Sequence, residues 1–206
     1  AWGVVVETAH AHEGQRVLIH AGSGGVGHFA VQLAAYFGAH VTVTSSARNA
    51  AWLRELGASV VIDYATTRFE DVVADMDVVI DLVANTEDEV GTRSLGVIRP
   101  GGRLMIMGSF CDRPVKVWWL EQFPRGPEVD AAMFPSLAET IETFTDAGWR
   151  VADVGSVLEP ATATRAELLD RLRLRTHSVF DYFTPEEVEA GFRRLEELVA
   201  EGPDVI

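Results

Sequence analysis

Cysteine, positive charge and long apolar runs are all scarce in this sequence. Cys111 is the only cysteine, which excludes an internal disulfide and a cysteine-rich zinc site, and we expect no metal site of another kind. No apolar run approaches the ~20 residues that a membrane-spanning helix needs, and the first residues lack the basic stretch and apolar core of a signal peptide. We therefore expect a cytoplasmic protein that has no contact with a membrane.

Basic residues are outnumbered by acidic ones. The chain has 17 Lys and Arg against 31 Asp and Glu, which gives a formal net charge of -14. Proteins that bind nucleic acid or anionic lipid through charge do so by neutralising phosphates with Lys and Arg. The charge balance therefore argues against both of these partners and favours a small molecule as the ligand.

The pattern of apolar residues predicts one α/β domain. With 206 residues, of which 48% are hydrophobic, the chain can bury one substantial core, so we expect a single domain over 1–206. Short β-rich runs alternate with helical patterns, which is the arrangement of a Rossmann-like doubly wound parallel sheet in three αβα layers, with the strand order 3-2-1-4-5. The expected strands are 16–20, 41–44, 59–62, 77–82 and 103–107, and the expected helices between them are 26–37, 49–56 and 87–98.

The two ends of the sequence have a different texture. Residues 2–11 are consistent with one helix, and residues 110–135 look like a long irregular connection. Beyond them we expect helices at 136–147, 165–175 and 185–200 and a sixth strand at 149–157. Because the last helix carries an apolar stripe of Val188, Phe192, Leu195 and Val199, we expect these helices to pack against the sheet.

A glycine-rich turn carries the strongest chemical signal. Gly22-Ser23-Gly24-Gly25-Val26-Gly27 directly follows the first expected strand and opens a helix. In this context the first glycine permits a tight turn, the middle ones let the backbone approach a pyrophosphate, and the last lets the helix pack closely on the sheet. A helix N-terminus also offers free N–H groups to phosphates. The sequence predicts a dinucleotide site here, and a glycine-rich turn without a ligand is the alternative.

The end of the second strand indicates which dinucleotide is bound. NAD sites usually place an Asp or Glu there to hold the ribose hydroxyls. This chain instead has Ser45 and Ser46 followed by Arg48, groups that suit the additional 2′-phosphate of NADP(H). The sequence therefore predicts NADP(H) and disfavours S-adenosylmethionine, whose usual site also needs an acid. The alternative is that Arg48 is simply solvated.

Longer stretches of the sequence resemble a known family. They are Gly-Gln-Arg-Val-Leu-Ile (14–19), Gly-Gly-Val-Gly-His-Phe-Ala-Val-Gln-Leu-Ala (24–34), Ser-Ala-Arg-Asn (46–49), Leu-Gly-Ala (56–58), Val-Ile-Asp-Tyr (61–64) and Leu-Gly-Val-Ile-Arg-Pro-Gly-Gly (95–102). Residues 14–108 resemble the cofactor domain of medium-chain dehydrogenase/reductases, in the NADPH-dependent quinone and enoyl reductase branch. The resemblance implies that Ser45, Ser46, Arg48 and Tyr64 surround the 2′-phosphate. It also implies that Val83 and Gly108 line the nicotinamide side.

The C-terminal half resembles a second family. Residues 134–140, 146–151, 171–180 and 191–195 resemble the C-terminal part of class I S-adenosylmethionine-dependent methyltransferases. We therefore expect 1–108 to be an NADP-binding reductase-like half and 109–206 a methyltransferase-like half, joined near 101–109 as a natural mosaic or an engineered chimera. We also expect the GroES-like catalytic domain of the reductase family to be missing.

These features favour an NADP(H)-binding domain of oxidoreductase ancestry. We expect its hydride transfer to be weak or dependent on a separate catalytic partner, and we expect either that partner or a homodimer. A methyltransferase-like protein and a scaffold without catalytic activity remain the alternatives. No catalytic residue can be assigned, because His177 is more simply interpreted as structural. For Trp118 and Trp119 we favour packing over the edge of the sheet rather than stacking on a flat ligand.

Overall fold

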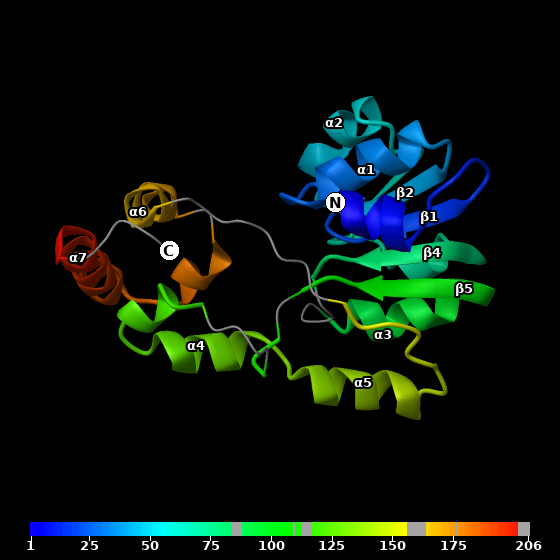
Figure 1. Ribbon diagram of the computed structural model, residues 1–206. Coiled ribbons are helices and arrows are strands. Elements are labelled where there is room, and N and C mark those ends of the chain that lie inside the picture. Colours follow the sequence, from blue (N-terminus) through cyan, green and yellow to red (C-terminus); the bar gives the residue numbers. More distant parts are fainter. Residues whose placement is uncertain (84–87, 109, 113–116, 156–163, 176, 202–206) are drawn as a thin grey trace. The chain divides into compact units, whose positions relative to one another are not determined.

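The computed structural model describes residues 1–83, 88–108, 110–112, 117–155, 164–175 and 177–201. Its contacts divide the chain into two compact units, Ala1–Ser109 and Phe110–Ile206, and each is described by itself (Figure 1). The division falls where the texture of the sequence changes. The expectation of one domain over 1–206 stays a prediction.

The first unit is built on a five-stranded parallel sheet in the order β3-β2-β1-β4-β5 (Figure 1). The strands are β1 Arg16–Ile19, β2 His40–Ser45, β3 Val60–Asp63, β4 Met76–Asp81 and β5 Ile98–Ile106. This confirms the predicted Rossmann-like fold class and strand order. All five strands were predicted to within two residues, except for the start of β5.

Strand β5 begins at Ile98, before the expected start at residue 103. The pairing register runs from Met76 opposite Ile98 to Val78 opposite Arg103, so extra residues of β5 stand against β4 at this point. They include Gly101, whose φ of 81° is in the left-handed region that favours glycine. The Pro-Gly-Gly segment is therefore an irregularity within the strand and does not precede it.

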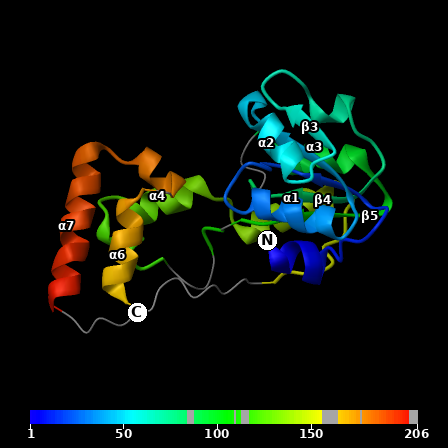
Figure 2. The same ribbon diagram turned by 90° about the horizontal axis from the view of Figure 1, so that it is seen from above.

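Helices cover both faces of the sheet (Figure 1, Figure 2). The helices of this unit are α1 Gly27–Tyr36, α2 Ala50–Glu55 and α3 Val90–Ser94, with the 3-10 turns η2 Ala47–Asn49, η3 Phe69–Asp71 and η4 Leu95–Val97. Alternate strand residues point to opposite faces, so Ile19 packs with Val31 of α1, whereas Leu18 packs with Phe69 and Val97. Apolar burial on both faces explains the nearly continuous apolar character of the strands.

The first residues form a shorter helix than the predicted 2–11. It is the π-helix η1 Gly3–Thr8, which buries Val5, and the following Ala9 is also buried. The guanidinium group of Arg103 in β5 donates hydrogen bonds to the carbonyl oxygens of Thr8 at 3.2 Å and Ala9 at 2.8 Å. These bonds satisfy carbonyl groups at the end of the helix and bind it to the sheet.

The second unit contains helices and no strand among its described residues. They are η5 Leu120–Gln122, α4 Gly126–Met133, α5 Leu137–Asp146, α6 Arg165–Arg173, η6 Ser178–Tyr182 and α7 Pro185–Glu201. Helix α5 begins with a capping box, in which Ser136 and Glu139 exchange hydrogen bonds. The predicted sixth strand is wrong for residues 149–155, and its last residues, 156 and 157, lie outside the described residues.

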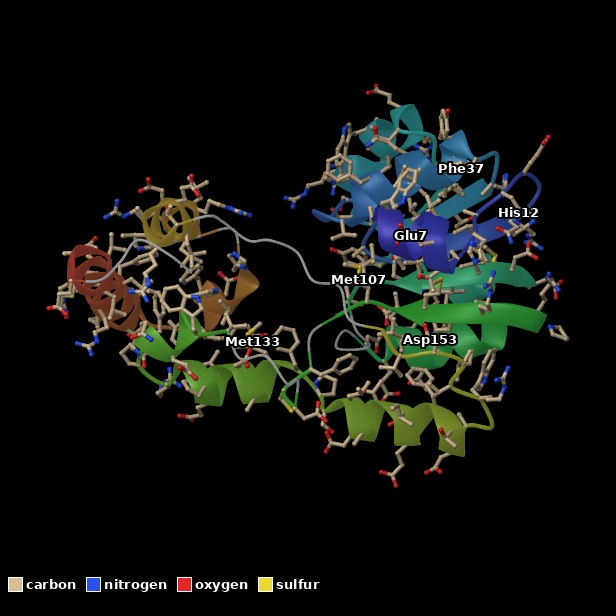
Figure 3. All side chains as sticks on the ribbon, in the orientation of Figure 1. Glu7, His12, Phe37, Met107, Met133 and Asp153 are labelled. Carbon is tan, nitrogen blue, oxygen red and sulfur yellow. The ribbon has the colours of Figure 1, made fainter. Side chains whose placement is uncertain are left out.

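Aromatic side chains form the core of the second unit. Phe123 packs against the rings of Phe180, Phe183 and Phe192, and Gly191 leaves room for it, since an added Cβ would lie 2.1 Å from Phe123 Cδ1. The stripe of α7 packs into this cluster, as does Met133 of α4 (Figure 3). We expected the sheet to cover that stripe, but helices of its own unit cover it. Trp118 and Trp119 pack on the same cluster, whereas the sequence analysis expected them to pack on the edge of the sheet.

None of the helices in the described ranges has the length and apolar character needed to cross a membrane.

Candidate functional site

The glycine-rich turn connects β1 to α1 and is held by close backbone packing. The N–H of Gly22 donates to the carbonyl oxygen of Thr44 at 3.0 Å, and the N–H of Gly24 donates to that of Ala21 at 2.9 Å. A Cβ on Gly22 would lie 2.9 Å from Cβ of Val43, and one on Gly27 would lie 2.2 Å from the carbonyl oxygen of Ala21. Both glycines are therefore required by the contact between helix and sheet.

The middle of the turn is open. A Cβ on Gly25 would meet no atom within 4 Å, and Gly25 is exposed. Among the described residues, no acceptor is paired with the N–H groups of Gly25 and Val26. Two unpaired donors at the start of a ten-residue helix form a cradle that an anionic oxygen fits. This is the part of the turn that the sequence assigned to a pyrophosphate.

Four polar side chains form a hydrogen-bonded cluster beside the turn. Ser45 at the end of β2 is 1% exposed, and its hydroxyl donates to Oγ of Ser23 in the turn at 3.0 Å. The side-chain amide of Asn49 donates to Oγ of Ser45 at 3.3 Å and to Oγ of Ser46 at 3.1 Å. The structure thus brings Ser23, Ser45 and Ser46 together. It adds Asn49, which our sequence analysis did not select as a site residue.

Arg48 and Tyr64 lie next to this cluster. Arg48 is exposed in η2, and within the described part of the chain its guanidinium group has no hydrogen-bond or ion-pair partner. Tyr64 follows β3, is 65% exposed, and its N–H donates to the carbonyl oxygen of Ser45 at 3.3 Å. The two residues therefore follow neighbouring strands at the same edge of the sheet.

Asp63, an acidic residue at this edge, uses its carboxylate for hydrogen bonds within the turn that follows β3. Asp63 pairs with Ser45 in the register of β2 and β3. Its carboxylate accepts from the N–H of Ala65 at 3.2 Å and the hydroxyl of Thr66 at 3.4 Å, and so closes the turn after β3. A carboxylate used in this way is not the ribose ligand that NAD sites place at the end of the second strand.

The two residues assigned to the nicotinamide side are linked through Asp81. The N–H of Val83 donates to Oδ1 of Asp81 at 2.8 Å, and the N–H of Met107 donates to the carbonyl oxygen of Asp81 at 2.8 Å. Gly108 follows Met107 and is exposed, whereas Asp81 is fully buried. Asp81 thus ties together the ends of β4 and β5, where Val83 and Gly108 lie. Our sequence analysis did not select it.

His20 is a buried histidine directly before the glycine turn. The hydroxyl of Ser94 donates to the carbonyl oxygen of Val90 at 2.7 Å, so its oxygen accepts from Nε2–H of His20 at 2.9 Å. Nδ1 of His20 then accepts from the hydroxyl of Thr44 at 3.1 Å, which makes the ring the neutral Nε2–H form. The ring joins β1, β2 and α3 at the carboxyl edge of the sheet.

The surroundings of His20 oppose its protonation. Burial, followed by the charge of Arg93, lowers the pKa of His20 from 6.5 to about 4, and Glu70 acts weakly in the opposite direction. Arg93 forms a bidentate pair with Glu70, at 2.6 Å from Nε to Oε1 and 2.7 Å from Nη2 to Oε2, and lies over the ring of Phe69. The edge of His20 packs on the same ring, 4.7 Å between centroids.

Acid is expected to destabilise this unit through His20. On acidification His20 gains its proton near pH 6.5 in the unfolded chain but only near pH 4 in the folded chain. The contribution of His20 to the free energy of unfolding is therefore complete above this window and is lost as the pH falls through it. Between about pH 7 and about pH 4.5, the free energy of unfolding should fall by about 2 kcal/mol through this group. Urea unfolding at the two pH values measures the loss.

The control for this measurement is His20→Gln, which keeps a donor and an acceptor but does not titrate. Its loss between the same pH values should be clearly smaller than that of the wild type. Glu70, whose pKa is lowered from 4.5 to about 2 first by its hydrogen bond to Arg93, loses its contribution only as the pH falls from 4.5 towards 2. Equal losses in both proteins would show that His20 does not carry the effect.

His177 belongs to the second unit. Its ring centroid is 5.5 Å from that of Trp119, so its described contact is with the aromatic cluster. No observation assigns it an acid-base role. In the residues that the structure describes, no three His, Cys, Asp or Glu side chains are grouped to hold a metal ion.

The parallel sheet, its strand order and the glycine turn at its carboxyl edge define a Rossmann-like α/β unit. Residues 25–149 match the family of zinc-binding dehydrogenases, and the chain belongs to this family. The match extends across the expected junction at 101–109. It also includes part of the region whose sequence resembles methyltransferases.

Several reductases are similar to parts of the chain. A trans-enoyl reductase of Aspergillus terreus is 39% identical over 94 residues, which are 43% of this chain and 26% of the reductase. The 2-methylene-furan-3-one reductase of Solanum lycopersicum is 36% identical over 104 residues, 50% of this chain and 26% of that protein. The chain thus matches about a quarter of the length of these relatives.

A solved structure extends the similarity to more of the chain. The quinone oxidoreductase from Coxiella burnetii has a TM-score of 0.56 and 26% sequence identity over 85% of this chain and 45% of that one. Together with the family match, this supports the reductase part of the resemblance stated from the sequence.

Proposed function

We propose that residues 1–206 are the NADP(H)-binding part of a quinone or enoyl reductase. The observation that carries the proposal is the set of groups at the end of β2. Ser46 has a hydroxyl hydrogen that no described acceptor takes, and Arg48 is exposed and has no acidic partner among the described residues. Ser45 is buried and donates its own hydrogen to Ser23. A hydroxyl donor and an uncompensated guanidinium suit a phosphate dianion better than neutral ribose hydroxyls.

Each part of the dinucleotide has a fitting group at this edge. The exposed ring of Tyr64 and the side chains of Ser46 and Arg48 would surround the adenosine 2′-phosphate, and the buried Ser45 would support them through its hydrogen bonds. The N–H groups of Gly25 and Val26 would bind the pyrophosphate. Gly22 and Gly27 would shape the turn, and Ser23 and Gly24 would lie beside the phosphates. Val83 and Gly108 would line the nicotinamide, which supplies or accepts the hydride.

Binding of three small molecules tests the proposal. We expect NADPH to bind the purified chain more tightly than NADH, because only NADPH carries the 2′-phosphate, and we expect no binding of S-adenosylmethionine. Titration of each compound by calorimetry measures this order. Tighter binding of NADH would refute the NADP(H) assignment, and binding of S-adenosylmethionine alone would favour the methyltransferase-like alternative. Binding of none of the three would leave the scaffold alternative.

We further propose that residues 1–206 by themselves transfer hydride only weakly, or that they need a separate catalytic partner. Val83 and Gly108 carry no acid-base group, so these residues offer contact but no proton transfer to a substrate. Mixed with NADPH and a simple quinone, the chain should oxidise NADPH well below the ordinary range of ~1–10³ per second. Absorbance at the nicotinamide band follows the reaction. A rate within that range would show that the site is complete as it stands.

Three finer expectations accompany this proposal. Assembly as a homodimer, the cytoplasmic location and a methyltransferase-like half at 109–206 stay predictions. The family match through residue 149 favours a continuous reductase fold over a mosaic or chimera.

A further inference from the structure

Asn49 stands at the start of α2, where an asparagine side chain usually caps the helix. It is the N-cap residue of α2, and asparagine is favoured at N-caps because its side chain can accept a hydrogen bond from the first turn of the helix. In this structure the side chain makes no such bond. Its amide nitrogen is directed back to the two serines at the end of β2.

The hydrogen bonds determine the direction of each hydroxyl group. The amide of Asn49 has two hydrogens, and they are donated to Oγ of Ser45 and Oγ of Ser46. The hydrogen of Ser45 is in turn donated to Oγ of Ser23 at 3.0 Å, which is the shorter of its two contacts, since the carbonyl oxygen of Ser46 lies at 3.4 Å. Ser23 and Ser46 therefore act as acceptors within the cluster, and no described acceptor takes their own hydroxyl hydrogens.

We infer that Asn49 is a positioning residue that turns the hydroxyl groups of Ser23 and Ser46 outward as donors to a phosphate ester. The inference rests on the proposed function and adds a residue to its site. An amide can donate but a carboxylate only accepts, so Asn49 gives the cluster a polarity that suits an anion. The hydrogen bonds from Asn49 to the buried Ser45 and from Ser45 to Ser23 also link the end of β2 to the glycine turn.

Reversing this polarity tests the inference. Asn49→Asp keeps the size of the side chain and removes no capping bond, because Asn49 makes none, but its carboxylate would accept from the serines and draw their hydrogens inward. NADPH binding should weaken by about 30-fold or more, and NADH binding by less than about threefold. Ala51→Asp is the matched control, since it adds the same charge on α2 at an exposed residue away from the serines. It should weaken NADPH binding by only about threefold.

A second set of variants tests whether Asn49 acts through the serines. Asn49→Ala should weaken NADPH binding by about tenfold in the wild type. In a chain that already carries Ser23→Ala and Ser46→Ala, the same change should cost less than about twofold, because no outward hydroxyl remains to be oriented. A merely structural asparagine would give the same loss in both backgrounds. Thermal melts show that each variant is folded.

The outcomes distinguish the inference from the proposed function. The inference is wrong, and the proposed function stands, if the wild type binds NADPH but Asn49→Asp binds it as tightly as Ala51→Asp does. The same holds if Asn49→Ala weakens NADPH binding by the same factor with and without Ser23→Ala and Ser46→Ala. If the folded wild type does not bind NADPH, the proposed function fails and the inference fails with it.

Discussion

Arg48→Glu is expected to weaken NADPH binding by about 2–4 kcal/mol and to leave NADH binding nearly unchanged. The substitution removes a charge-assisted contact with the 2′-phosphate and places a like charge beside it. Arg48 is exposed in η2, and the described residues provide it with no ion pair, so its loss should alter the stability of the fold by no more than about 0.5 kcal/mol. The measurement is a titration of both cofactors against wild type and variant.

Arg54→Glu is the matched control for this prediction. Arg54 is an exposed residue of the last turn of α2, so the variant has the same change of net charge at a position beyond the serine cluster. We expect its effect on NADPH binding to be a small fraction of that of Arg48→Glu. Equal losses for NADH and NADPH in Arg48→Glu would mean that Arg48 supports the loop in general. No loss for either cofactor would remove Arg48 from the site.

Gly27→Ala should reduce the stability of the fold, whereas Gly25→Ala should reduce dinucleotide binding alone. A Cβ on Gly27 would lie 2.2 Å from the carbonyl oxygen of Ala21, a backbone atom that cannot move without displacing α1 from the sheet. Gly27→Ala should therefore lower the free energy of unfolding by about 2–3 kcal/mol and weaken dinucleotide binding with it. Gly25 has open space around it, so Gly25→Ala should leave stability nearly unchanged.

Gly25→Ala should nevertheless weaken the binding of both dinucleotides by about 1–3 kcal/mol, because its methyl group stands where the pyrophosphate approaches the backbone. Urea unfolding and cofactor titration, carried out on both variants, separate the two effects. If Gly25→Ala binds NADPH and NADH like the wild type, the pyrophosphate does not approach at Gly25. If Gly27→Ala is as stable as the wild type, the close packing at Ala21 does not constrain the turn.

Part of the site could be predicted because it depends on local sequence. The glycine spacing identified the turn, and the absence of an acid after β2 directed attention to Ser45, Ser46 and Arg48. Asn49 was missed although it lies within the Ser-Ala-Arg-Asn stretch, because asparagine before a helix is more simply interpreted as a cap. His20 and Asp81 were missed because a polar residue at the end of a strand gives no sign of its partners.

The second unit shows where periodicity is insufficient. Val188, Phe192, Leu195 and Val199 were correctly placed on one face of a helix, but a helical stripe does not specify what covers it. The expected cover was the sheet, and the observed one is the aromatic cluster around Phe123. The apolar residues after Trp149 were consistent with a strand, yet 149–155 have no strand partner in the described structure.

By itself the sequence determined the parallel sheet, its strand order and the position of the glycine turn. These follow from alternating apolar runs, from the handedness of strand–helix–strand connections and from the steric freedom of glycine. The tertiary structure alone decided which polar groups share hydrogen bonds. His20 and Ser94 are 74 positions apart, and Ser23 and Ser45 are 22 apart. Such pairs form only when neighbouring strands and helices direct their side chains to the same place, which no local pattern encodes.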